Sequence, residues 1–457
     1  MINLYLSRVA VCAVVIVCLG LVCGTPSLSQ SASRPADMEG KSTSGSSSIF
    51  SKIPELLKDY FAKGEVSLAA KIGVNAARDG DHELAVRAFI RALNAIEQSD
   101  QKIADLLVLR ATSLNELGKF EQALNDNDQA VRVRPNKAWT YWERGRTLRK
   151  LERLEESLKD YDRAIQIDPN NSQIHLGRGR TLRTLKRIDE ARDAFAHSIE
   201  LDPKNWRALF NRADLYSETG DYDKSVKDFT AAIDIRPSAD TYYNRGNTYL
   251  KLGNKQASLK DYESSIELDP RDASAYYNRG IAYQDLNQTK QAIASYDRAI
   301  ELNPQHANAY FNRGKAYQNI NQPKQAIESY DHAVELNPKH ASAFYNRGNS
   351  HSKMGEHHKA IKDYTQAIEL NPKHVSAHVN RGNRYRDLGE SKKALADYHT
   401  ALDIDPAQLD AIRNRGWLYA KRGQDDLARI DYERGLKLSP NDKWLNWAVS
   451  QLEKSER

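Results

Sequence analysis

One short unit recurs along most of the chain at a fixed period, and this repetition constrains the fold more than any other feature. The segment 273–306 reads ASAYYNRGIAYQDLNQTKQAIASYDRAIELNPQH, and the segment 307–340, directly after it, reads ANAYFNRGKAYQNINQPKQAIESYDHAVELNPKH. Small residues, aromatic residues, an Asn-Arg-Gly triplet and a closing proline return at the same places. This period predicts one array of similar units rather than the two to four globular domains that 457 residues could form.

The closing prolines give the number of units. They recur at one constant interval, apart from a slightly shorter step between Pro237 and Pro270, and they lie at Pro135, Pro169, Pro203, Pro237, Pro270, Pro304, Pro338, Pro372, Pro406 and Pro440. An earlier copy at 66–99 lacks the proline, so we count about eleven units over 66–442. The final segment, 443–457, begins like the first part of a unit and then becomes polar, which predicts a capping helix at the C-terminal end of the array.

Each unit is predicted to form two helices joined by a turn, so the fold class is all-α. The first helix ends at a position that holds glycine in most copies and asparagine at 287 and 321. Both residues tolerate the left-handed conformation that follows a helix C-terminus. Glu152 and Lys186 occupy this position in two copies, where we expect slight strain. The second helix ends before the proline, because the residue before proline disfavours helical geometry.

This pattern resembles the tetratricopeptide repeat family over about 66–442. The shared features are the period, a glycine such as Gly280 in the first helix, alanines such as Ala292 and Ala299 in the second, and the closing proline. The resemblance implies a right-handed superhelical solenoid of helix-turn-helix repeats. It also implies a concave groove lined by the first helices, which holds protein segments.

The chain departs from the family pattern just before the first-helix glycine, where the family often has an apolar residue. Ten copies have arginine there, and nine of them have an aspartate on the paired second helix. The aspartate stands at one of two spacings, the shorter as from Arg245 to Asp261 and the longer as from Arg279 to Asp297. This recurrence predicts an Arg–Asp pair inside each hairpin, which fixes the register of the two helices. Arg178 is the exception, and the alternative is a ladder of arginines that binds anionic ligands.

The asparagine before these arginines is the leading candidate for partner binding, because the family places this position on the groove. A carboxamide both donates and accepts hydrogen bonds, so it can pair with the backbone of an extended peptide. The alternatives are that these side chains bridge neighbouring repeats or meet water. The predicted groove asparagines are Asn211, Asn244, Asn278, Asn312, Asn346, Asn380 and Asn414. The neighbouring aromatic residues predicted to line the groove are Tyr243, Tyr277, Phe311 and Tyr345.

Basic residues outnumber acidic residues within 134–192, which predicts a basic patch on adjacent first helices. Such a patch could bind an acidic peptide or a polyanion, with a solvated basic face as the alternative. Its members are Arg146, Arg149, Lys150, Arg180, Arg183 and Lys186.

The N-terminal residues differ in composition from the repeats. Arg8 precedes an apolar run, 9–22, that is about as long as a signal-peptide core and short for a membrane-spanning helix. The alternatives for 1–24 are a cleaved signal peptide, an uncleaved membrane anchor and a lipoprotein signal ending at Cys23. A flexible Ser-rich linker over 25–52 and a short leading helix over 53–65 are predicted to follow. All three cysteines lie in this leader, so the repeats have no thiolate site or disulfide.

The repeats contain no catalytic motif, and we predict no catalytic residue, metal site or cofactor. The net charge of +6 is small beside 67 basic and 61 acidic residues, so it does not by itself indicate a polyanionic partner. The sequence therefore predicts a non-catalytic scaffold that binds protein or peptide and is exported or membrane-tethered. The periplasm, the cell envelope and the extracellular space are the compartments expected. The alternatives are an accessory or substrate-targeting subunit of an envelope enzyme such as a glycosyltransferase, and a polyanion-binding protein.

Overall fold

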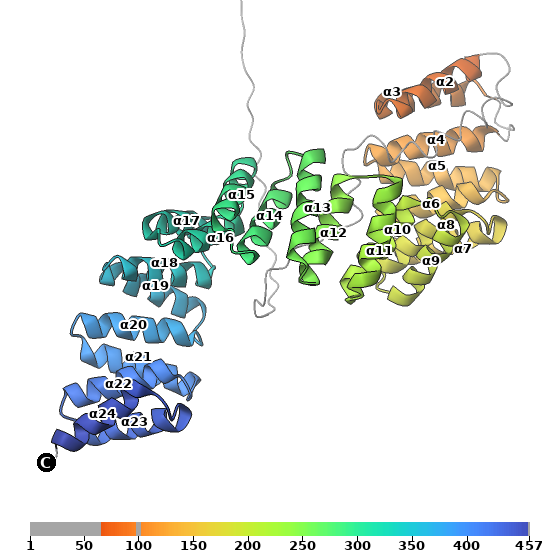
Figure 1. Cartoon of the computed structure of the whole chain (residues 1–457). Coiled ribbons are helices and arrows are strands. Elements are labelled where there is room, and N and C mark those ends of the chain that lie inside the picture. Colours follow the sequence, from red (N-terminus) through yellow and green to blue (C-terminus); the bar gives the residue numbers. More distant parts are fainter. Residues whose placement is uncertain (1–64, 97–101, 456–457) are drawn as a thin grey trace, which may run out of the picture. The chain divides into compact units, whose positions relative to one another are not determined.

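The computed structural model describes residues 65–96 and 102–455, and the regular structure in these ranges is entirely helical (Figure 1). The predicted leader, the linker and nearly all of the leading helix, 1–64, lie outside the described residues. The first helices of the pairs are α2 (Glu65–Arg78), α4 (Lys102–Glu116), α6 (Ala138–Lys150), α8 (Ser172–Thr184), α10 (Trp206–Thr219), α12 (Ala239–Lys251), α14 (Ala273–Asp285), α16 (Ala307–Asn319), α18 (Ala341–Lys353), α20 (Val375–Asp387) and α22 (Leu409–Lys421).

The second helices follow them in alternation, and one further helix comes after the last pair. They are α3 (His82–Asn94), α5 (Phe120–Val133), α7 (Leu154–Ile167), α9 (Ile188–Leu201), α11 (Tyr222–Ile235), α13 (Lys255–Leu268), α15 (Thr289–Leu302), α17 (Pro323–Leu336), α19 (His357–Leu370), α21 (Ser391–Ile404) and α23 (Asp425–Leu438), with α24 (Lys443–Ser455) at the end. Each helix packs against its partner, and each pair packs against the pairs before and after it. The predicted all-α array of helix-turn-helix units is confirmed.

The turns within the pairs have the predicted left-handed residue. Glycine has a positive φ there in most copies, as at Gly253 with φ 76°. Asn287 and Asn321 take the same conformation at φ 59° and 60°, and so do Glu152 and Lys186 at φ 59° and 61°. The last two residues bear the cost of placing a Cβ atom in this region, as predicted.

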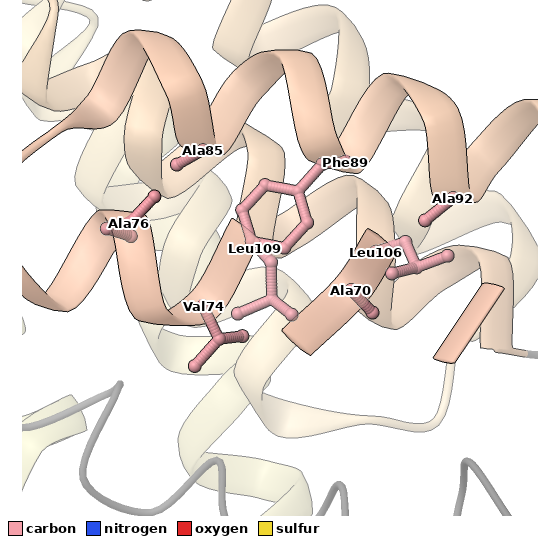
Figure 2. Packing of buried hydrophobic residues seen from close by; sticks show 9 residues of the cluster. Ala70, Val74, Ala76, Ala85, Phe89, Ala92, Leu106 and Leu109 are labelled. Carbon is pink, nitrogen blue, oxygen red and sulfur yellow. The ribbon is translucent and has the colours of Figure 1, made fainter. Parts of the chain in front are cut away.

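A close approach of the two helices explains the glycine of the Asn-Arg-Gly triplet. A Cβ atom added to Gly280 would lie 2.5 Å from the ring of Tyr296, which is fully buried. The same crossing recurs in the first pair, where the ring of Phe89 packs among Ala70, Val74 and the next helix (Figure 2). An aromatic ring on the second helix thus fills the space that the missing side chain leaves, which is how a repeat builds a core from few large residues.

The predicted arginine pairs form in seven hairpins, all of which have the shorter of the two spacings. In each, the guanidinium contacts the aspartate on the paired second helix, as in the bond from Arg245 Nη2 to Asp261 Oδ1 at 2.7 Å. The pairs are Arg110–Asp126, Arg144–Asp160, Arg212–Asp228, Arg245–Asp261, Arg347–Asp363, Arg381–Asp397 and Arg415–Asp431.

The prediction is wrong for the aspartates at the longer spacing. Asp297 pairs with Arg313 of the following repeat at 2.9 Å, and Arg279 donates to the Ser295 hydroxyl at 3.1 Å. The longer spacing places the carboxylate about half a turn further along the second helix, which directs it toward the next pair of helices. Arg178, the predicted exception, uses the same geometry and pairs with Asp162 of the preceding repeat at 2.7 Å.

None of the helices within 65–96 and 102–455 combines the length and the apolar composition that crossing a membrane requires.

Candidate functional site

The seven asparagines predicted to line the groove lie on consecutive first helices, but they differ in exposure. Asn211, Asn244 and Asn278 are buried, with exposed fractions of 1%, 2% and 1%. The other four, on α16, α18, α20 and α22, are partly exposed. A ligand can therefore reach the carboxamides only in the C-terminal half of the set.

Several of these asparagines bridge neighbouring repeats. The Nδ2 atom of Asn278 donates to the Tyr243 hydroxyl at 3.0 Å and to Asn247 Oδ1 at 2.9 Å, both on the preceding first helix. Asn380 makes the same two bonds, to Tyr345 at 3.2 Å and to Asn349 at 3.0 Å. Two others make one bond of this kind each, Asn312 to Tyr277 and Asn414 to Asn383. The bridging alternative thus describes these four residues.

Asn247, Asn349 and Asn383 take part in this network and were missed in the sequence. Each accepts a bond from the buried tyrosine of its own second helix, at 2.7 Å from Tyr262 and at 2.8 Å from both Tyr364 and Tyr398. They stand three residues after the groove asparagine, and residues three apart lie on one helix face. The sequence motif Asn-Arg-Gly-Asn, which occurs in three repeats, was the signal that could have revealed them.

Three groove asparagines do not bridge to another repeat within the described residues. Asn211 and Asn346 donate to carbonyls of their own helices, those of Arg207 at 2.7 Å and Ser342 at 2.9 Å. The carboxamide of Asn244 is buried and has no partner there. Asn346 differs from the other two because it is partly exposed, so its carboxamide is accessible to a ligand.

The predicted groove aromatics are mostly covered by the chain itself. Tyr243 is 3% exposed, whereas Tyr277, Phe311 and Tyr345 are half-buried. Each of these three packs on a tyrosine of its own second helix and on a histidine of the next repeat, with centroids 4.5–4.6 Å apart for the histidine contacts. Burial raises the pKa of Tyr277 to about 12, so its hydroxyl stays protonated at neutral pH. Only part of each ring is available to a partner.

The accessible part of this surface is polar and aromatic. On α16, Lys315 is exposed and its Nζ lies 5.8 Å from the centroid of the Phe311 ring. On α22, the partly exposed Trp417 ring carries two cations, Arg386 at 5.5 Å and Lys421 at 5.4 Å. Arg386 also donates to Asn414 Oδ1 at 3.0 Å. Such a surface can contact apolar side chains through the rings and carbonyl oxygens through the carboxamides and cations.

Two arginines of the predicted basic patch pair with carboxylates. Arg146 pairs with Glu116 at 2.6 Å, and Arg183 pairs with Asp214 at 2.7 Å and Glu218 at 2.5 Å. Of the remaining members, Arg149 is buried, Lys150 and Arg180 are half-buried and Lys186 is exposed. The structure does not bring these six residues together as a bare cationic surface.

A buried carboxylate occupies the asparagine position in one N-terminal repeat. Glu143 has no exposed surface and accepts hydrogen bonds from Asn115 at 3.1 Å and Thr112 at 3.2 Å on the preceding first helix. Burial raises the pKa of the Glu143 carboxyl above its ordinary value, and Arg146 opposes this shift. The position thus bridges repeats even where its residue is not asparagine.

The part of the chain that the structure describes contains no cluster of three or more metal-ligating side chains. His306, His340 and His374 recur once per repeat, and each contacts an aromatic ring.

Comparison with solved structures found several chains of similar fold. YrrB, a tetratricopeptide protein with an unusual peptide-binding site, is 25% identical over 42% of this chain and 99% of its own, with a TM-score of 0.39. MamA from Desulfovibrio magneticus is 23% identical over 37% of this chain and 96% of its own, with a TM-score of 0.36. A repeat protein from Cytophaga hutchinsonii is 17% identical over 52% and 99%, with a TM-score of 0.47. A search of curated proteins found no match.

Models of known protein families match most of the repeats. A model described as "Tetratricopeptide repeat" matches 239–272, 273–306, 307–340 and 341–374. A "TPR repeat" model matches 145–185 and 382–423, and two further "Tetratricopeptide repeat" models match 176–240 and 411–442. Together these matches cover 145–374 and 382–442, which is more than half of the 457 residues. With its helix pairs, its left-handed turns and its glycine–tyrosine crossings, the chain belongs to the tetratricopeptide repeat family.

Proposed function

We propose that this protein is a non-catalytic scaffold that binds an extended protein segment along its first helices. The observation that carries the proposal is the partly exposed row of carboxamides and rings on α16, α18, α20 and α22. Asn346 is the central residue of this row, because its side chain is accessible and donates only within its own helix among the described residues. The buried asparagines Asn211, Asn244 and Asn278 lie on the earlier helices α10, α12 and α14 and are not part of this accessible row.

The chemistry of this row favours a peptide backbone over a defined side chain. Asn312 and Asn380 use Nδ2 to bridge repeats, so the ligand would bond chiefly to their Oδ1 atoms, which accept. Asn346 is one repeat from each of them along the array. A peptide N–H could then be held at each repeat, while Phe311 and Tyr345 contact apolar side chains through the exposed parts of their rings.

The test uses peptides selected on the full chain. Binders are taken from a random peptide library, and their Kd is measured for the wild type and for the N312A/N346A variant. We expect binding at least tenfold weaker in the variant, because each lost hydrogen bond contributes about 1 kcal/mol. The matched control is L427A, which truncates an exposed leucine on α23, a second helix. Equal Kd values for wild type and N312A/N346A would contradict the proposal.

We also propose that residues 1–24 direct export or tether the protein to a membrane. The support is the sequence alone, in which Arg8 precedes the apolar run 9–22. N-terminal sequencing of the protein from its native host distinguishes the alternatives. A new N-terminus near 25–30 indicates a cleaved signal, Met1 in a membrane fraction indicates an anchor, and Met1 in a soluble cytosolic fraction contradicts both.

The alternative functions have less support from the described residues. The carboxylates that pair with Arg146 and Arg183 reduce the positive charge available to a polyanion. A role as a targeting subunit of an enzyme would use the same first-helix surface, so it is a special case of the scaffold proposal with an enzyme as the partner.

A further inference from the structure

The residue that caps the start of the first helix changes character within the array. In several repeats it is a residue whose side-chain oxygen accepts a backbone N–H bond at any pH near neutrality. In three successive repeats it is histidine. The oxygen caps are Asn171, Asn205, Ser238 and Asp272, and the histidine caps are His306, His340 and His374.

The three histidine caps have the same geometry. The Nδ1 atom accepts the backbone N–H of the residue three positions later, Ala309, Ala343 or Ala377, at 3.3 Å in each case. An imidazole nitrogen accepts a hydrogen bond only while it carries no proton. Each cap therefore requires the neutral histidine with its proton on Nε2.

Each histidine also joins two repeats. Its ring lies against an aromatic ring of the preceding first helix, with centroids 4.6 Å apart for His306 and Tyr277, 4.5 Å for His340 and Phe311, and 4.6 Å for His374 and Tyr345. The interplanar angles are 36–37°. One side chain thus supports both the start of a helix and the packing across the boundary between repeats.

We propose that these three histidines form a pH-sensitive element that loosens the array over α15–α20 in mild acid. Protonation of Nδ1 removes the acceptor from the cap. It also places a positive charge at a helix N-terminus, where the backbone N–H groups already carry partial positive charge. Because the three sites are in consecutive repeats, one change of pH weakens three adjacent boundaries together.

The surroundings of the three histidines favour a loss of the caps in acid. Tyr277, Phe311 and Tyr345 are the rings that face them. Among the described residues, His378 is the one titratable neighbour that acts on a cap, and it lowers the pKa of His374 further. Burial is the main cause that lowers the pKa of all three histidines. The attraction of a protonated ring to an aromatic face opposes the effect.

The lowered pKa values of the three histidines determine how stability changes with pH. A histidine whose pKa is lower in the folded state than in the unfolded chain favours folding in its neutral form. Its full contribution is present above the ordinary histidine pKa of about 6.5 and is lost as the pH falls from that value through the lowered pKa of the folded state. The looser state is therefore the acidic one.

Hydrogen exchange on the full chain tests the proposal, with rates corrected for the intrinsic effect of pH. At about pH 5, compared with about pH 7.5, we expect protection across 289–388 to fall roughly three- to thirtyfold, the range expected for losing one cap per boundary. Protection across 206–268, where Asn205 and Ser238 supply the caps, should fall less.

The control variant is H306N/H340N/H374N. Asn205 accepts the Ala208 N–H at the same 3.3 Å, so asparagine suits this position and does not titrate. We expect the variant to keep its protection over 289–388 at both pH values. An equal acid-induced loss in wild type and variant, or no loss in the wild type, would overturn the proposal. If the triple variant does not fold, H340N should keep protection at the α17–α18 boundary alone.

Discussion

Asn278 on α14 donates one Nδ2 hydrogen to Asn247 Oδ1 on α12, 2.9 Å away and buried at the boundary between two repeats. Its second bond, at 3.0 Å, is to the hydroxyl of Tyr243 on the same helix as Asn247. The asparagine that the sequence singles out for a partner thus holds the array together at this position. The same carboxamide serves different purposes in different repeats, according to its burial.

Replacing Asn278 should destabilise the protein, whereas replacing Asn346 should not. The change Asn278→Ala removes the bond to the Tyr243 hydroxyl and one of the two bonds to Asn247 Oδ1, which keeps its bond from Tyr262. Losing these buried bonds costs about 1–3 kcal/mol. The change Asn346→Ala removes a bond within one helix at a partly exposed site, with an expected effect within about 0.5 kcal/mol. Because repeats contact only their neighbours, hydrogen exchange of peptides spanning 239–302 is the appropriate measurement. Unchanged protection there in N278A would contradict the bridging role.

A methyl group at Gly280 should disturb the crossing of α14 and α15. The added Cβ would lie 2.5 Å from the Tyr296 ring, so the ring or the helix must move. We expect Gly280→Ala to cost about 1–3 kcal/mol, as overpacking does in well-packed cores. Urea denaturation followed by circular dichroism measures the effect.

The double variant G280A/Y296L provides the control for this crossing. A smaller side chain at 296 leaves room for the methyl group, so the two changes should cost less together than the sum of their separate costs. If the stability costs of the two substitutions simply add, the contact with the Tyr296 ring is not the reason why glycine occupies position 280.

Arg347 contacts two carboxylates of unequal burial, and we expect them to contribute unequally to the stability of the fold. It donates to Asp363 of its own hairpin at 2.5 Å and to Asp331 of the preceding repeat at 2.7 Å. The Asp363 side chain is 4% exposed and the Asp331 side chain 55%. We expect Asp363→Ala to cost about 3–5 kcal/mol, since it removes one partner of a buried pair.

The corresponding change Asp331→Ala should cost about 0–1 kcal/mol, because solvent screens the pair it removes. Chemical denaturation of both variants at low and high salt gives the comparison. Added salt should reduce the difference in the free energy of unfolding between wild type and D331A. It should leave the difference between wild type and D363A nearly unchanged. The reverse order of the two costs would contradict the assignment of Asp363 as the partner that fixes the register.

The buried Glu143 should make stability depend on pH in a defined direction. Its pKa is raised by burial, so the folded protein takes up a proton at a higher pH than the unfolded chain does. The contribution of this residue to folding therefore becomes more favourable as the pH falls through the raised pKa toward the ordinary value. Above the raised pKa, the folded protein bears the full cost of a buried charge.

The isosteric change Glu143→Gln removes that charge and keeps an acceptor for Asn115 and Thr112. We expect E143Q to unfold at higher urea concentration than the wild type at neutral pH, with a difference that shrinks in acid. Denaturation midpoints at several pH values measure it. A constant difference across the pH range would show that the charge of Glu143 is not the source.

Sequence alone determined the elements that depend on neighbours along the chain. The period, the prolines and the left-handed turn residues such as Asn287 are local signals, because backbone conformation is set within a few residues. The pairing of Arg245 with Asp261 was also predictable, since their separation is fixed by one hairpin. The family pattern added the expectation that the first helices form the binding surface.

Tertiary structure decided every contact that crosses from one repeat to the next. Asp297 pairs with Arg313 rather than with Arg279, and Asn278 pairs with Asn247, because adjacent helix pairs bring together side chains of successive repeats. The periodic sequence offers both hairpin and boundary partners at similar spacings, so it cannot choose between them. The way in which neighbouring pairs pack sets that choice, and it also determines which asparagines are buried and which remain accessible to a partner.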